Sequence, residues 1–283
     1  MMSKSMMTRI ISAAVAIVIA VIVLIFHNTF VFPLAIALLA TIAVYELFKA
    51  TGENKHMIQS IICMSYVFLE CVSMIWLLKG KLLFFNNYLF MGILVIGMSI
   101  MYLRNHEKFK FNDYFVMIAI SLLIPFAFKT LLYMNSYPNV GLFMVVTTLC
   151  GAWLADSGAY FAGTFFGKTP LCPSISPKKT VEGVVGGVVS NGLIFIIIGL
   201  FYEYVLKGAE IHYVPLFLSG MICAVIGLIG DLTASIIKRQ TGIKDYGNLM
   251  PGHGGVMDRF DSVLLVAPFM YYVFSQGWIV NII

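Results

Sequence analysis

The hydrophobic positions of this 283-residue chain form long, unbroken runs, and the polar residues gather in short stretches between them. A helix needs about 20 apolar residues to cross the ~30 Å hydrocarbon core of a bilayer. The runs lack the alternating segments of about ten residues that mark a transmembrane β-barrel. The pattern predicts an all-α, polytopic integral membrane protein with about nine transmembrane helices, at residues 10–27, 29–50, 57–79, 82–103, 113–135, 139–165, 182–206, 213–237 and 261–281.

Composition agrees with this interpretation. The chain is 60% hydrophobic and 11% charged, whereas soluble domains are about 25% charged, and the spans leave no soluble domain over. The first run follows Lys4 and Arg9 as a signal sequence would, but it is too long for the apolar core of a signal peptide and no small-residue cleavage site follows it. We expect a retained helix. The five cysteines include no C-x-x-C pair and the five histidines are scattered, which gives little support to a zinc or disulfide framework.

The cations record an orientation in the membrane. With nine spans and a cytoplasmic N-terminus, fourteen lysines and arginines fall on the inner side and four, Lys79, Lys81, Lys129 and Lys207, on the outer side. This is the positive-inside distribution of a multi-pass protein of the cell membrane. It accounts for the net charge of +5 without a nucleic-acid partner. The loops 166–181 and 238–260 are therefore predicted to face the cytoplasm, and the C-terminus to lie outside.

Acidic residues are distributed unevenly along the chain. Of six aspartates only Asp113 precedes residue 150, and the other five are Asp156, Asp231, Asp245, Asp258 and Asp261. We therefore expect residues 1–138 to be a transmembrane scaffold and residues 139–283 to be the catalytic transmembrane region. Glu46 and Glu70 lie in or near spans of the scaffold, with no neighbouring ligand set in the sequence.

Two of these aspartates lie inside predicted spans. A charge at the bilayer centre costs on the order of 2.5–3.5 kcal/mol on insertion scales, so Asp156 and Asp231 are expected to face a partner or a wet cavity. The alternative is that each is hydrated near the interface or hydrogen-bonded to a neighbouring helix. Helical spacing places Asp231 on one face with Ser235, Lys238 and Arg239.

Asp258 and Asp261 are three residues apart, so they share a face at the start of a further helix. Oxygen ligands from two helices suit Mg²⁺, which takes one or two carboxylates and completes its shell with water and substrate phosphate.

The stretch NLMPGHGGVMDRFD, residues 248–261, is rich in glycine. Gly254 and Gly255 follow His253 and permit backbone conformations in which consecutive N–H groups form an anion-binding nest. A helix that starts near Val256 would add its positive end. Most such turns only join helices, but here Lys244 and Asp245 lie upstream and Arg259 lies between the two aspartates.

The stretch FGKTPLCPSISPKKTVE, residues 166–182, brings Lys178 and Lys179 close to Glu182. It is either an ordinary basic loop whose hydroxyls cap the next helix or, because it holds three prolines, a stiff and shaped loop. In the helix after it, Gly183 and Gly187 form a G-x-x-x-G pattern that is typical of close helix packing.

Two of these stretches carry a family resemblance. SIIKRQTGIKDYGNLMPGHGGVMDRFD, residues 235–261, resembles the signature of the phosphatidate cytidylyltransferases, the CDP-diacylglycerol synthases. DSGAYFAGTFFGKTPLCPSISPKKTVEG, residues 156–183, is similar to that family's second conserved block. The resemblance implies a polytopic helical fold, the substrates CTP and phosphatidic acid, the products CDP-diacylglycerol and pyrophosphate, and one or two divalent ions, with room for an additional monovalent cation. It alone suggests a homodimer.

By position, the resemblance makes Asp231 and Asp258 the metal ligands, and it places Asp261 next to them. The other catalytic candidates are Lys238, Arg239 and His253. The candidates for substrate binding are Asp156, Lys178, Lys179, Glu182, Ser235, Lys244, Asp245, Gly254, Gly255 and Arg259.

The residues fit that chemistry on physical grounds too. Two polyanions must meet in a site of low dielectric constant, and metal and cations can neutralise them, so catalysis is largely positioning and charge stabilisation. Two other functions stay open: a CTP-dependent lipid kinase, which would release CDP, and a secondary transporter, which also places acidic residues in the membrane.

Overall fold

The computed structural model describes residues 4–74, 87–205 and 209–281, and these residues form two compact units. Unit 1 consists of Met1–Leu132 with Thr241–Arg259, and unit 2 consists of Tyr133–Gln240 with Phe260–Ile283. The polar stretch after residue 240 thus belongs to the unit of the N-terminal helices.

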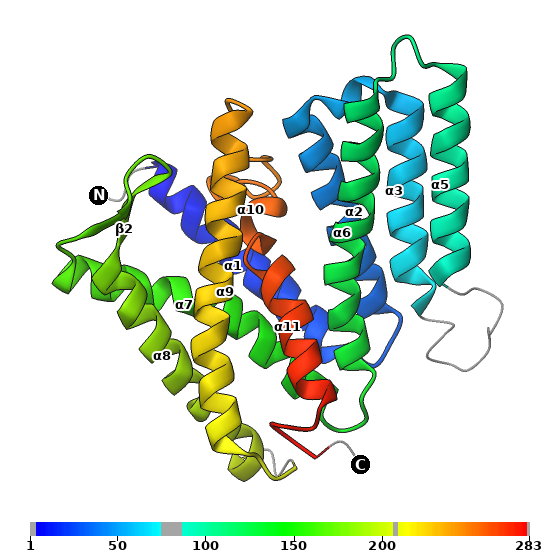
Figure 1. The fold of residues 1–283 in the computed structure, drawn as a ribbon. Coiled ribbons are helices and arrows are strands. Elements are labelled where there is room, and N and C mark those ends of the chain that lie inside the picture. The colour runs from blue at the N-terminus through cyan, green and yellow to red at the C-terminus, as the bar shows by residue number, and fades with distance from the viewer. Residues whose placement is uncertain (1–3, 75–86, 206–208, 282–283) are drawn as a thin grey trace. The chain divides into compact units, whose positions relative to one another are not determined.

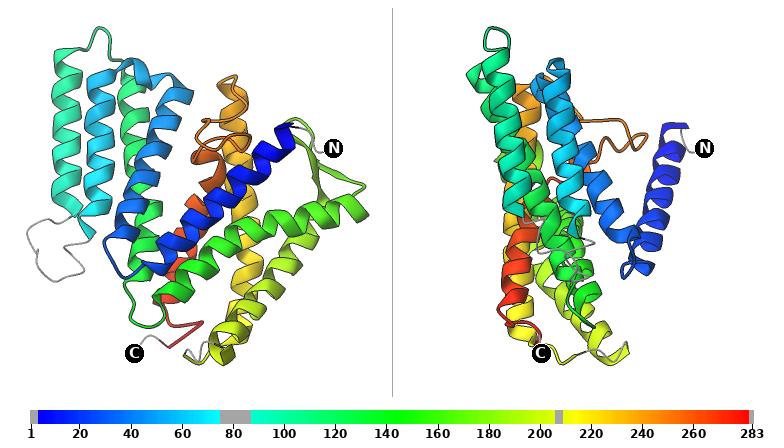
Figure 2. Two further views of the ribbon diagram at one scale, coloured as in Figure 1. Left: turned by 180° about the vertical axis from the view of Figure 1, so that it is seen from behind. Right: turned by 90° about the vertical axis from the view of Figure 1, so that its right-hand side faces the viewer.

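Unit 1 is built from the helices α1 (Lys4–Ile25), α2 (Val31–Thr51), α3 (Met57–Val72), α5 (Asn87–Arg104) and most of α6 (Phe111–Asn135), with the short 3₁₀ helix η1 (Glu53–Lys55) between α2 and α3. α3 packs between α2 and α5 (Figure 1). Figure 2 shows that α1 stands off from α2 beyond the turn at residues 26–30. No residue of its apolar stretch Met7–Ile25 is buried.

Unit 2 contains α7 (Gly141–Phe166), α8 (Val181–Leu200), the π-helical turn η2 (Phe201–Val205), α9 (Tyr213–Gln240) and α11 (Val263–Ser275). The short helix α10 (Met257–Phe260) lies where the chain passes into this unit. α8 packs against α7 and α9, and α11 contacts α7 and α9.

Small residues set the packing of these helices. A Cβ on Gly183 would lie 2.8 Å from the Ala159 carbonyl oxygen, and one on Gly187 would lie 2.9 Å from that of Ala155, so the predicted close-packing face of α8 is confirmed. One buried amide joins three helices, because Asn191 Nδ2 of α8 donates to the carbonyl oxygens of Gly151 in α7 and Gly220 in α9, at 3.1 and 2.7 Å.

The helices bear out a multi-pass membrane protein. In the described residues, six helices are long and apolar enough to cross a membrane, and the shorter apolar helices Met57–Val72, Tyr88–Arg104 and Val263–Ser275 overlap the other three predicted spans. The count of nine stays a prediction. The end of the 57–79 span, the start of the 82–103 span and the outer-side residues Lys79, Lys81 and Lys207 lie outside the described residues.

The stretch between α7 and α8 is a β-hairpin, which the sequence did not predict. β1 (Pro170–Cys172) pairs antiparallel with β2 (Ser176–Thr180), with Pro170 opposite Thr180 and Cys172 opposite Ser176. Figure 1 shows the hairpin extending from the adjoining ends of α7 and α8. The shaped loop that the three prolines suggested is therefore a small sheet, and β2 passes directly into the first turn of α8.

Candidate functional site

The glycine-rich turn of unit 1 depends on glycine at two positions. Gly252 and Gly254 have φ angles of +79° and +87°, a region that other residues rarely adopt. The turn closes where the Met250 N–H donates to the Gly254 carbonyl oxygen at 2.9 Å. A Cβ on Gly254 would lie 2.7 Å from Asp258 Oδ2, so this glycine also makes room for the aspartate.

Asp258 organises the turn from within. Its Oδ2 accepts hydrogen bonds from the N–H groups of Tyr246 and Gly255, at 2.8 and 3.0 Å, and its side chain is 9% exposed. A carboxylate that accepts backbone N–H groups is held firmly in place. The aspartate predicted as a metal ligand is therefore fixed by the glycine turn around it.

The next two N–H groups bind a carboxylate of the predicted scaffold. Glu46 of α2 accepts from Val256 N at 3.1 Å and from Met257 N at 2.8 Å, and it is 4% exposed. A Cβ on Gly255 or Gly247 would lie 2.2 or 2.1 Å from Glu46 Oε1. The predicted nest exists, but its donors are taken by carboxylates of the chain itself. An acidic residue inside an apolar run was the sequence signal for Glu46.

A cavity of about 360 Å³ opens beside the turn, a volume within the ~300–1,000 Å³ range of small-molecule sites. The cavity is lined by Arg9, Lys244, Asp245, Asn248, Gly252, His253, Gly254 and Arg259. Three cations among these residues give it a positive character.

Two residues of α1 belong to this cavity and its rim, and no sequence pattern indicates either role. Arg9 lies against Gly252, since a Cβ there would be 2.7 Å from Arg9 Cγ. Ser12 Oγ hydrogen-bonds His253 Nδ1 at 2.9 Å and donates to the Pro251 carbonyl oxygen at 2.9 Å. From the sequence, Arg9 is predicted only to mark orientation, and no local pattern links residues some 240 positions apart.

Unit 2 holds the second group of predicted site residues. Asp231, Ser235 and Lys238 are half-buried along α9, and Arg239 is exposed. Asp231 forms an ion pair with Lys179 of β2. The hairpin thus places Lys179, one of the two predicted lysines, beside Asp231 of α9, while Lys178 is exposed.

Asp261 lies close to α9 because α9 has a glycine at the point of contact. A Cβ on Gly230 would be 2.7 Å from the Asp261 carbonyl oxygen. Asp261 is 8% exposed, its Oδ1 accepts from Ser262 N at 2.8 Å, and the charges of Asp231, Lys238 and Asp156 all act on it. Three carboxylates therefore share one neighbourhood in unit 2.

These three carboxylates are the ligand type that a hard divalent cation takes. Like charges so placed repel one another unless a cation compensates them, and the donors are all oxygens, as Mg²⁺ prefers. The cations that the structure places here are Lys179 and Lys238.

Glu182 has a local role in shaping the hairpin. Its carboxylate accepts from Lys168 N at 3.1 Å and from Thr169 N at 3.1 and 3.2 Å. Thr180 caps α8, since its Oγ1 accepts from Gly183 N at 3.1 Å, a preferred N-cap arrangement. These contacts hold both ends of the hairpin and thereby position Lys179.

The predicted site residues thus fall into two sets. Unit 1 holds Lys244, Asp245, His253, Gly254, Gly255, Asp258 and Arg259, and unit 2 holds Asp156, Lys178, Lys179, Glu182, Asp231, Ser235, Lys238, Arg239 and Asp261. The pairing of Asp231 with Asp258 as metal ligands stays a prediction.

Comparison with known proteins gives a consistent picture. The sequence model described as "Cytidylyltransferase family" matches residues 7–276. The chain is 31% identical over 285 residues to the phosphatidate cytidylyltransferase of Haemophilus influenzae, an alignment that covers 94% of this chain and 97% of that one. It is 37% identical over 169 residues to the phosphatidate cytidylyltransferase of Bacillus subtilis, covering 60% of this chain and 61% of that one. A 40% identical stretch of 142 residues matches the Synechocystis protein of the same name, covering 49% of this chain and 45% of that one.

Proposed function

Because the chain belongs to the cytidylyltransferase family, we propose that it transfers the cytidylyl group of CTP to phosphatidic acid, giving CDP-diacylglycerol and pyrophosphate. The observation that carries this proposal is the relative named phosphatidate cytidylyltransferase that matches over 94% of the chain. The two stretches that resemble the family signature supply most of the residues of the sites in units 1 and 2, and Asp231, Glu46 and Arg9 come from outside them.

In the reaction, a phosphate oxygen of the lipid forms a bond to the α-phosphorus of CTP, and the bond from that phosphorus to the β-phosphate bridging oxygen breaks. Both reactants are anions, so their approach in a site of low dielectric constant needs positive charge on the protein. The cavity of unit 1, with Arg9, Lys244 and Arg259 in its lining, is suited to the triphosphate. No covalent nucleophile is needed, and positioning accounts for most of the catalysis.

We propose Mg²⁺ as the cofactor, with Asp231 and Asp258 as its ligands and Asp261 beside them. When bound, the ion would polarise the phosphoryl oxygens and neutralise charge. Asp258 lies three residues before Asp261 along the chain, which limits the separation of their Cα atoms to about 10 Å. The carboxylate neighbourhood of unit 2 supports a cation at this point. A second ion, divalent or monovalent, is an expectation from the resemblance.

The proposed place of the reaction is the cytoplasmic face of the cell membrane. Fourteen of the eighteen lysines and arginines fall on the side assigned to the cytoplasm, and that side includes the loops 166–181 and 238–260. CTP would then come from the cytoplasm and the lipid from the adjacent leaflet. A homodimer is proposed from the family resemblance.

The test is to identify the products of purified protein in detergent, with CTP, phosphatidic acid and Mg²⁺. Release of pyrophosphate with formation of CDP-diacylglycerol is the expected result. Release of CDP with a phosphorylated lipid would establish a lipid kinase instead. An absence of any product in detergent, with protein that is folded, would favour a transporter, because transport needs a sealed membrane.

A further inference from the structure

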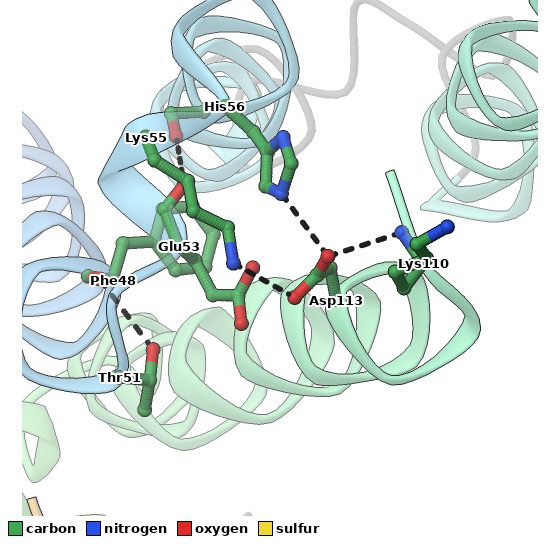
Figure 3. A network of polar contacts seen from close by, with 8 residues as sticks. Phe48, Thr51, Glu53, Lys55, His56, Lys110 and Asp113 are labelled. Atoms are coloured by element: carbon green, nitrogen blue, oxygen red, sulfur yellow. Dashed lines mark hydrogen bonds and ion pairs between the residues drawn. The ribbon is translucent and has the colours of Figure 1, made fainter. Parts of the chain in front are cut away.

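A second cluster of ligand-type side chains lies in unit 1, at one end of the helices α2, α3 and α6. It consists of Glu53 in η1, His56 at the start of α3 and Asp113 in the first turn of α6 (Figure 3). One ligand atom from each of the three residues lies within 4.8 Å of the other two. The proposed reaction does not use this cluster.

Glu53 is the member of the cluster with a buried carboxylate oxygen that no hydrogen bond satisfies. Its side chain is 5% exposed, and Oε2 is buried and accepts no hydrogen bond. Burial, and next the charge of Asp113, raise the pKa of the Glu53 carboxyl. A buried carboxylate oxygen that faces a second carboxylate is costly unless a cation is bound there.

His56 is held in a position that suits its imidazole to act as a metal ligand. Its backbone N–H donates to the Glu53 carbonyl oxygen at 2.9 Å, and its ring packs edge-on against the ring of the buried Phe109, with centroids 4.8 Å apart. The Nε2 atom lies 3.1 Å from Asp113 Oδ2. This is a hydrogen-bonding distance, and it places the imidazole beside the carboxylate whose other oxygen, Oδ1, a cation can reach.

One carboxylate oxygen of Asp113 caps helix α6, and the other is accessible to a cation. Oδ2 accepts from Lys110 N at 3.0 Å and so caps α6, and Oδ1 pairs with Lys55 Nζ at 3.2 Å. The Lys55 side chain is 58% exposed, and ion pairs of this kind contribute only about 0–1 kcal/mol. A bound cation can replace the lysine at little cost.

We propose that Glu53, His56 and Asp113 form a binding site for a divalent transition-metal ion of the Zn²⁺ type, which clamps the turn between α2 and α3 to the start of α6. One imidazole and two carboxylates favour Zn²⁺ over Mg²⁺ and Ca²⁺, which prefer oxygen ligands alone. Three protein ligands leave a fourth position for water. The site is independent of the proposed catalytic metal in both its residues and its ligand chemistry.

The test is zinc binding by the full chain, purified in detergent, stripped with a chelator and titrated with Zn²⁺ alone. Wild type is expected to bind one equivalent more than Glu53→Gln or His56→Gln, or to bind that equivalent at least about 10-fold more tightly. The catalytic carboxylates are identical in all three proteins, so the difference isolates this cluster. Lys55→Gln is the matched control, because it removes the ion pair and keeps all three ligands, and it should bind Zn²⁺ at least as tightly as wild type. Equal zinc affinity and stoichiometry in wild type, Glu53→Gln and His56→Gln would overturn the proposal.

A second measurement needs no variant. Co²⁺ in a tetrahedral site with an imidazole ligand gives intense visible absorption, whereas octahedral oxygen sites absorb weakly. Wild type loaded with one equivalent of Co²⁺ should show the intense bands, lose them on addition of Zn²⁺, and unfold at a higher temperature with either ion than without. A weak octahedral spectrum and an unchanged unfolding temperature would contradict the proposal, and the three side chains would then form only a hydrogen-bonded ion-pair cluster.

Discussion

Asp231 and Asp258 are the same residue type with different partners. Asp231 pairs with Lys179, whereas Asp258 accepts two backbone N–H groups inside the glycine turn. Both are proposed to hold the catalytic Mg²⁺, so removal of either charge should act on catalysis much more than on folding.

Asp231→Asn and Asp258→Asn should each lower pyrophosphate release by at least about 100-fold, because even outer partners of metal ligands are worth 10–100-fold. Asp258→Asn should unfold close to the wild-type temperature, because its amide oxygen can take the place of Oδ2 and still accept from Tyr246 N and Gly255 N. Activity and unfolding temperature are measured on the same samples. An aspartate that only ties segments together would, as asparagine, lower the unfolding temperature and leave turnover per folded molecule intact.

Glu46 is expected to act on the glycine turn through position rather than by touching substrate. Glu46→Gln places an amide N–H₂ against the N–H of Val256 or Met257, which should cost about 1–3 kcal/mol and raise the KM for CTP. Glu70→Gln is the matched control, because Glu70 is another buried glutamate of unit 1 and is paired with Lys129 at 2.6 Å. It should lower the unfolding temperature and leave the KM for CTP unchanged. Equal KM values for the two variants would remove Glu46 from the site.

At the scale of elements, the hairpin β1–β2 separates two neighbouring lysines. Successive side chains of a strand point to opposite faces, and Lys179 pairs with Asp231 whereas Lys178 is exposed. Lys179→Ala should lower kcat/KM by about 10–100-fold, the equivalent of the ~1.5–3 kcal/mol of a charged hydrogen bond. Lys178→Ala should change it by less than about 3-fold, as an exposed charge does. Assays at low and saturating CTP distinguish lost binding from lost turnover, and equal losses in the two variants would contradict the assignment.

The sequence predicted the helices better than it predicted the hairpin. Bilayer thickness sets the length of an apolar run, so each predicted range overlaps an apolar helix in the described residues, although α3 and α11, with 16 and 13 residues, are shorter than the ranges predicted for them. The stretch 166–181 has three prolines and no alternation of polar and apolar residues, and β1 has only three residues, so local pattern could not reveal its pairing.

At the scale of the whole molecule, the orientation in the membrane can be read from a native thiol. Cys172 lies partly exposed in β1, Cys63, Cys71 and Cys223 are buried, and the partly exposed Cys150 of α7 is replaced by alanine for the experiment. A membrane-impermeant thiol reagent should therefore leave Cys172 unlabelled in intact cells and label it after permeabilisation. Ser136→Cys, in an exposed position of the loop assigned to the outside, should label in intact cells. Labelling of Cys172 in intact cells would reverse the orientation and the proposed route of CTP.

Long-range contacts are the part of the site that sequence reasoning missed. The site residues within 230–261 could be predicted because they lie close together in the sequence and form a recognisable pattern. Glu46 lies 210 residues from Val256, and Ser12 lies 241 residues from His253. Neither pairing leaves a local pattern, and only the acidic character of Glu46 within an apolar run marked it as unusual.

The contact between Glu46 and the turn also orders events during synthesis. At about 5–20 residues per second, α2 leaves the ribosome roughly 10–40 s before Val256 and Met257, the two N–H donors that Glu46 binds in the folded protein. During that interval the apolar helix α2 carries an acidic side chain without those donors. Its insertion into the bilayer is therefore less favourable. A chain that terminates before residue 256 never acquires them, so its Glu46 stays without the two backbone donors that it has in the folded protein.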